Sequence, residues 1–146
     1  MDILNLLKSL NAHKVDYVII GAMVFPFYGY SRTTLDIDIF IEPSKDNAKK
    51  TLAALKKFGY DVTDISIRDL LSKKLLIRQY AVETDIHPFV TGVTFDEIWQ
   101  SKEKGDFEGV PVFFPSLEKV IKMKKAAGRA KDKEDLKYLQ KLKKRK

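Results

Sequence analysis

The sequence predicts a single α/β (α+β) domain in which helices flank a mixed β-sheet, with further helices at the C-terminal end. Segments with helical apolar spacing alternate with short strand-like segments, but without the regularity of repeated strand–helix–strand units, which favours a mixed sheet. The length of 146 residues suits one compact domain, and neither a repeat nor a long linker divides it. We therefore expect one domain over residues 1–146, with a basic helical segment from about residue 116 to residue 146.

Helices and strands alternate through the first 60 residues. The expected elements are a helix at 3–10, a strand at 16–20, a short helix at 22–28, a turn at 29–31, a strand at 35–41 and a helix at 45–58. The first strand is an unbroken apolar run that stops at Gly21, and the second alternates aspartate with aliphatic residues. Pro26 is expected to kink the short helix, and Gly59 to end the long one.

The second half of the chain contains shorter elements. The pattern indicates a helical turn at 67–71, strands at 75–80 and 82–87, a helix at 95–99, a strand at 110–114 and helices at 117–127 and 132–142. Pro88 stops the second of these strands, and Gly128 ends the helix that precedes the last one. Asp132 is the expected N-cap of the last helix.

Composition excludes several kinds of site. The chain has no cysteine, which removes disulfides, thiolate zinc sites and cysteine nucleophiles. His13 and His87 are its two histidines, too few for a histidine-rich metal site. The N-terminus lacks the pattern of a secretory leader, and no apolar run reaches the length of a membrane span. We therefore expect a cytoplasmic protein without a membrane partner.

Basic residues gather at the C-terminal end. Residues 119–146 hold 13 lysines and arginines against 3 acidic residues, a balance of +10, whereas the first 118 residues balance at −3. The net charge of +7 is therefore a property of the C-terminal segment. A basic segment beside an acidic site suits a protein that handles phosphates or nucleic acid, and the alternative is a solvated helical face.

The strand at 35–41 contains the most informative pattern. Alternate side chains of a strand share a face, so Asp36 and Asp38 point together, away from the isoleucines between them. Arg32 and Thr34 join that face if the extended backbone reaches back to them. Aspartates repel each other and are disfavoured in strands, so the pair indicates a bound cation, and oxygen ligands suit Mg²⁺ or Mn²⁺. The alternative is an edge strand with two solvated aspartates.

The strand at 82–87 supplies another carboxylate. Glu83, Asp85 and His87 share one of its faces, and beside the first strand Asp85 completes a cluster of three carboxylates. Glu83 competes as the third ligand, and a cross-strand pair with a lysine is the alternative role for Asp85. His87 is expected to be a packed or surface imidazole, which is not a usual magnesium ligand.

Four stretches, in order along nearly the whole chain, carry a resemblance to a known family. They are residues 19–22, 28–38, 85–88 and 123–135. Together they resemble the DNA polymerase β-type nucleotidyltransferase superfamily, and within it the small stand-alone bacterial and archaeal nucleotidyltransferase-like proteins. The chain is also similar to the nucleotidyltransferase-type toxins of abortive-infection systems.

The resemblance implies transfer of a nucleoside monophosphate from a nucleoside triphosphate to a hydroxyl by a two-metal in-line mechanism. It implies that Asp36 and Asp38 bridge two Mg²⁺ or Mn²⁺ ions, and that Asp85 binds the ion that activates the acceptor hydroxyl. The implied nucleotide contacts include Gly21 and Ala22, although the superfamily usually has Gly-Gly or Gly-Ser there, and alanine supplies no hydroxyl.

Three further residues are expected to contact the nucleotide. Arg32 and Thr34 share the aspartate face, with a salt bridge to Asp36 as the alternative role of the arginine. Lys124 lies on the apolar stripe of its helix, where it must reach the rim or meet an anion. Close by, Arg129, Lys131, Asp132 and Asp135 match the Arg-x-Lys-Asp-x-x-Asp element of the family, with helix capping as the alternative role of the two aspartates.

The expected partners are a nucleoside triphosphate and an acceptor that the sequence leaves open, an RNA such as tRNA or a protein hydroxyl. A second hypothesis is a catalytically reduced nucleotide-binding or toxin–antitoxin module of the same fold, with a partner protein, which Gly21-Ala22 favours. A third hypothesis is a nucleic-acid-binding domain that acts through the basic C-terminal segment alone.

Overall fold

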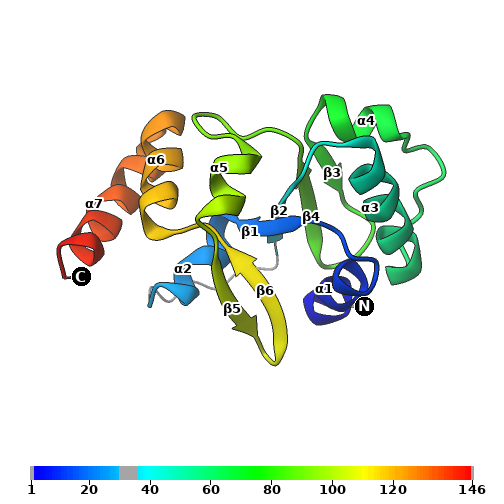
Figure 1. Cartoon of the computed structure of the whole chain (residues 1–146), viewed down its shortest axis with the longest axis horizontal. Helices are drawn as coiled ribbons and strands as arrows, with labels where there is room; N and C mark the ends of the chain where they lie inside the picture. Colours follow the sequence, from blue (N-terminus) through cyan, green and yellow to red (C-terminus); the bar gives the residue numbers. More distant parts are fainter. Residues whose placement is uncertain (1, 30–35, 146) are drawn as a thin grey trace.

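The centre of the domain is a mixed sheet with the strand order β1-β2-β4-β3 (Figure 1). The computed structural model describes residues 2–29 and 36–145, with side chains up to residue 144. The strands of this sheet are β1 Tyr17–Ile20, β2 Asp36–Ile41, β3 Leu75–Ile77 and β4 Glu83–His87. β2 is antiparallel to β1 and parallel to β4, and β3 is antiparallel to β4, so the predicted mixed sheet is confirmed.

Helices surround this sheet. They are α1 Ile3–Ala12, the 3₁₀ turn η1 Gly21–Met23, α2 Val24–Phe27, α3 Lys45–Phe58, α4 Ile67–Ser72, α5 Phe95–Gln100, α6 Leu117–Ala127 and α7 Ala130–Arg145. Several begin at a polar N-cap whose side chain accepts a backbone N–H of the first turn: Asp2, Ser44, Ser66, Thr94 and Ser116. Among the described residues, no helix has the length and apolar character needed to cross a membrane.

The two faces of the sheet are covered differently. Ile37, Ile39 and Ile41 of β2 are fully buried in the main hydrophobic cluster, to which α1 and α3 also contribute. On the other face, Phe40 packs at right angles to Phe95 of α5, with ring centroids 5.2 Å apart. α6 and α7 lie on the side of the strands away from α1 and α3 (Figure 1). The N-terminal half of β2 on this second face is therefore left open, and it carries Asp36 and Asp38.

Some expected elements differ from the observed ones. The short helix at 22–28 is two pieces, η1 and α2, because Pro26 cannot donate the backbone hydrogen bond that would continue one helix. The strand expected at 75–80 ends at Ile77, and residues 30 and 31 of the expected turn lie outside the described residues.

One strand was not predicted. β5 Glu103–Phe107 is mostly charged, yet it pairs with β6 Val110–Phe114 in a hairpin. Glu108 and Gly109 connect them with φ of 49° and 91°, the positive values that a tight two-residue hairpin turn requires.

Candidate active site

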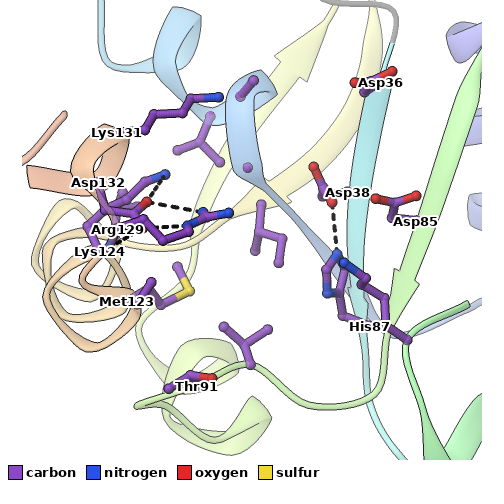
Figure 2. A pocket seen from close by; sticks show the side chains of 18 of the residues that line it. Asp36, Asp38, Asp85, His87, Thr91, Met123, Lys124, Arg129, Lys131 and Asp132 are labelled. Atoms are coloured by element: carbon purple, nitrogen blue, oxygen red, sulfur yellow. Dashed lines mark hydrogen bonds and ion pairs between the residues drawn. The ribbon is translucent and has the colours of Figure 1, made fainter. Parts of the chain in front are cut away.

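The parallel pairing of β2 with β4 brings the predicted carboxylates together. In this register Asp38 lies opposite Asp85, so their side chains are neighbours on the open face. His87, two residues further along β4, places Nε2 2.8 Å from Oδ1 of Asp38 (Figure 2). One potential ligand atom from each of these three residues lies within 4.8 Å of the other two. The close cluster therefore combines two carboxylates with an imidazole.

Asp36 stands one pleat away from this cluster. It is exposed, and Figure 2 shows it separated from Asp38 along β2. Its register partner is Glu83, and the Asp36 carboxylate raises the pKa of Glu83, first by accepting a hydrogen bond from the protonated Glu83 carboxyl and then by its negative charge. Asp36 thus lines the same cavity as Asp38 without joining the close group.

Arg78 pairs with the far side of the cluster. Its Nη1 lies 2.8 Å from Oδ1 of Asp85, and its Nε lies 3.6 Å from Oε2 of Glu83. These carboxylates raise the pKa of Arg78, the hydrogen bond to Asp85 most of all. No motif in the sequence marks Arg78, which directly follows the short strand β3.

Gly21 is required by the position of Asp38. It has φ of +73°, and a Cβ atom at this position would overlap Oδ2 of Asp38. The sharp turn from β1 into η1 therefore passes directly against the aspartate. Gly21 and Ala22 both line the cavity, as predicted, and their contacts with a nucleotide stay a prediction.

The cluster opens into a cavity of about 660 Å³, a size typical of small-molecule sites. One wall is acidic and comes from β2 and β4: Asp36, Asp38 and Asp85, with His87. The opposite wall comes from α6 and the start of α7 and is mainly basic, with Lys124, Arg129 and Lys131 beside Asp132; Lys74 also lines the cavity. Figure 2 shows Arg129 extending across the cavity from the basic wall toward the acidic one.

The basic wall is held by a buried aspartate. Asp132 has no exposed surface, and it accepts hydrogen bonds from Nε of Arg129 at 2.7 Å and from the Arg129 backbone N–H at 3.1 Å. Lys124 Nζ lies 3.3 Å from Asp132 and 3.4 Å from Asp135. These donors, Arg129 first, lower the pKa of Asp132 to about 2.

Two expectations about this region change. Asp132 is the third residue of α7 and not its N-cap, because the helix already begins at Ala130; its carboxylate instead reaches back to the N–H of Arg129. Lys124 was expected to reach the rim or to meet an anion. It meets two protein carboxylates, those of Asp132 and Asp135, and its contact with a nucleotide stays a prediction. Arg32 and Thr34 lie outside the described residues.

The donor set fits a divalent cation. Oδ1 of Asp85 lies 2.8 Å from Nη1 of Arg78, and because a carboxylate oxygen has two lone pairs, it retains capacity as a metal ligand beside this ion pair. Carboxylates suit Mg²⁺ and Mn²⁺, and the imidazole of His87 adds a ligand that transition metals accept more readily than Mg²⁺ does. A cation on the acidic wall and an anion on the basic wall can be held at the same time across this cavity.

Comparison with known protein families gives one match over the whole chain. Residues 1–146 match the family described as "Nucleotidyl transferase of unknown function (DUF2204)". No curated protein matches the chain. The match confirms the resemblance to nucleotidyltransferases at the level of the family, and the resemblance to toxins stays a prediction.

Proposed function

The chain belongs to this family of nucleotidyl transferases, and we propose that it moves a nucleoside monophosphate from a nucleoside triphosphate to a hydroxyl acceptor. The observation that carries the proposal is the cavity in which an acidic wall faces a basic wall. A nucleoside triphosphate bound with a divalent cation presents both charges to such a site, the cation to carboxylates and the phosphates to cationic side chains.

Asp36, Asp38 and Asp85 are the proposed ligands of Mg²⁺ or Mn²⁺, which when bound would neutralise phosphate charge and acidify the acceptor hydroxyl. In the proposed transfer the acceptor oxygen forms a bond to the α-phosphorus, and the bond from that phosphorus to the departing pyrophosphate breaks. Asp85 takes the hydroxyl proton. Asp38 is oriented for its role by His87 on one side and by the close backbone of Gly21 on the other.

The basic wall is proposed to bind the phosphates. The side chain of Arg129 is 71% exposed, and its Nε donates a hydrogen bond to Asp132, which holds the guanidinium in place. The N–H groups of the guanidinium that do not contact Asp132 can donate to a ligand in the cavity. Lys131 adds positive charge on the same wall, and Lys124, already paired with Asp132 and Asp135, is proposed to contact the phosphates as a hydrogen-bond donor. The backbone of Gly21 and Ala22, together with Arg32 and Thr34, completes the proposed set of nucleotide contacts.

The decisive experiment uses each of the four nucleoside triphosphates labelled at the α-phosphate, the one that the proposed reaction transfers. The protein is incubated with a cell extract and Mg²⁺ or Mn²⁺, and labelling of the extract is measured. We expect labelling of one class of acceptor, an RNA such as tRNA or a protein, which identifies that partner. Asp38→Asn should abolish labelling, because it removes a proposed ligand while keeping the shape of the side chain. Asp64→Asn, at an exposed position outside the cavity, is the matched control and should label at the wild-type rate.

Ala22 favours a second candidate, a nucleotide-binding or toxin–antitoxin module with reduced catalysis, because the position offers no hydroxyl to the phosphates. That candidate predicts binding of the metal–nucleotide complex without labelling of any acceptor. Label transfer by the wild-type protein would exclude it.

A further inference from the structure

Phe89 places an aromatic ring in water at the edge of the cavity. It is 61% exposed, more than Leu76 at 53% and Phe27 at 37%, the other exposed large hydrophobic side chains of the described residues. Phe89 belongs to neither hydrophobic cluster in that part of the chain. Complete burial of a phenyl side chain is worth roughly 2 kcal/mol, and Phe89, more than half exposed, leaves the larger part of that free energy available to a ligand.

The segment that carries Phe89 is anchored on both sides. It follows Pro88, which is buried, and Val90 forms a bridge with Val93 through a backbone hydrogen bond of 3.4 Å. Val90 also packs against the hydrophobic cluster beneath α5. The ring therefore projects from a fixed stretch of backbone, two residues beyond His87 of the acidic cluster.

Apolar side chains line the same cavity as Phe89. Val90, the next residue in the chain, and Met123 are among them, and Thr91 adds a hydroxyl. Figure 2 shows Met123 and Thr91 near each other, at the end of the cavity opposite Asp36 and Lys131. In the proposed complex the cation and the phosphates take the two charged walls, so this apolar end is available to another part of the nucleotide.

We propose that Phe89 is the platform on which the base of the bound nucleotide stacks, at the apolar end formed with Val90 and Met123. The inference rests on the proposed function, since it names the part of the nucleotide that this end receives. A base is flat, aromatic and largely apolar on its faces, and stacking on a phenyl ring is favourable for every base. Phe89 would therefore strengthen nucleotide binding without choosing strongly among the four bases.

The test compares two ligands by calorimetry at constant Mg²⁺: a nucleoside triphosphate and inorganic tripolyphosphate, which has the charge but no base. Phe89→Ala should weaken nucleotide binding by about 5- to 150-fold and leave tripolyphosphate binding unchanged. Phe89→Tyr should restore nucleotide binding, because it keeps the ring.

A second readout reports stacking directly. Compared with the wild type and its Trp99, Phe89→Trp should gain an additional fluorescence component that nucleotide quenches and tripolyphosphate does not. Equal weakening of both ligands by Phe89→Ala would overturn the inference, as would unchanged nucleotide binding. If the wild type bound neither ligand, the proposed function itself would fail, and that result is distinct from both of these.

Discussion

At the scale of single residues, the site depends on side chains that constrain one another. Asp38 is bounded by the imidazole of His87 at 2.8 Å and by the backbone of Gly21, where no Cβ fits. Asp85 is bounded by Arg78. Each carboxylate of the close cluster therefore has a set position before any ligand arrives, which reduces the ordering that binding must supply.

The overlap at Gly21 gives a sharp prediction. Gly21→Ala should displace Asp38 and weaken Mn²⁺ binding, measured by titration followed by electron paramagnetic resonance. The positive φ alone costs an alanine about 1 kcal/mol, so unfolding in urea should show at least that loss.

Gly109→Ala separates the two effects. Gly109 has φ of +91°, but a Cβ there would have nothing within 4 Å. The Gly109→Ala variant should therefore lose about 1 kcal/mol of unfolding free energy and bind Mn²⁺ as the wild type does. Normal Mn²⁺ binding by Gly21→Ala as well would show that Asp38 does not depend on this close approach.

At the scale of elements, the carboxylate of Asp132 joins α6 to α7. It binds Lys124 of α6 and the residue before α7, and it has no exposed surface. A carboxyl group whose pKa is lowered from 3.8 to about 2 contributes stability that is complete above pH 4 and is lost as the pH falls toward 2.

We therefore expect the wild type to lose about 2 kcal/mol of unfolding free energy between pH 4 and pH 2 through Asp132. Asp132→Asn should be less stable at pH 7 and should lack this part of the acid dependence in urea unfolding curves. Glu134→Gln, on the exposed side of the same helix, should retain the wild-type dependence. Parallel acid profiles for Asp132→Asn and the wild type would contradict the assignment.

Elements with strong local signals could be predicted from the sequence, and those fixed by distant contacts could not. The bounds of α3 and α6 follow from a serine N-cap, a helical apolar stripe and a terminal glycine. β5 has no such signal, because a charged strand in a hairpin is stabilised by its partner. The period-two pattern predicted the convergence of Asp38 with Asp85, whereas the contacts of Arg78 and His87 depend on strand register, which spacing alone does not give.

At the scale of the whole molecule, the cavity lies between two structural units. The sheet supplies the acidic wall, and the α6–α7 pair supplies the basic wall. A ligand that binds both walls should therefore hold the two units together.

A nucleoside triphosphate with Mg²⁺ at 100 times its Kd should add about 2.7 kcal/mol of stability, which is roughly 5–10 °C in Tm for a domain of this size. A chelator should remove the shift, and Asp38→Asn should not show it. Amide hydrogen exchange should slow in α6 and α7 as well as in β2 and β4. Protection limited to the sheet would argue against binding at the basic wall.

The parallel register of β2 with β4 has a consequence for how the chain tolerates change. The separation of Asp38 from Asp85 is set by the backbone hydrogen bonds between these two strands, and within the long connection through α3, α4 and β3 it is β3 and Arg78, not the surface loops, that contact the site. Insertions in the surface loops of that connection, or new chain ends opened there by circular permutation, should leave the carboxylate pair in place. The lengths of these surface loops can therefore change among related proteins while the carboxylates of the site keep their positions.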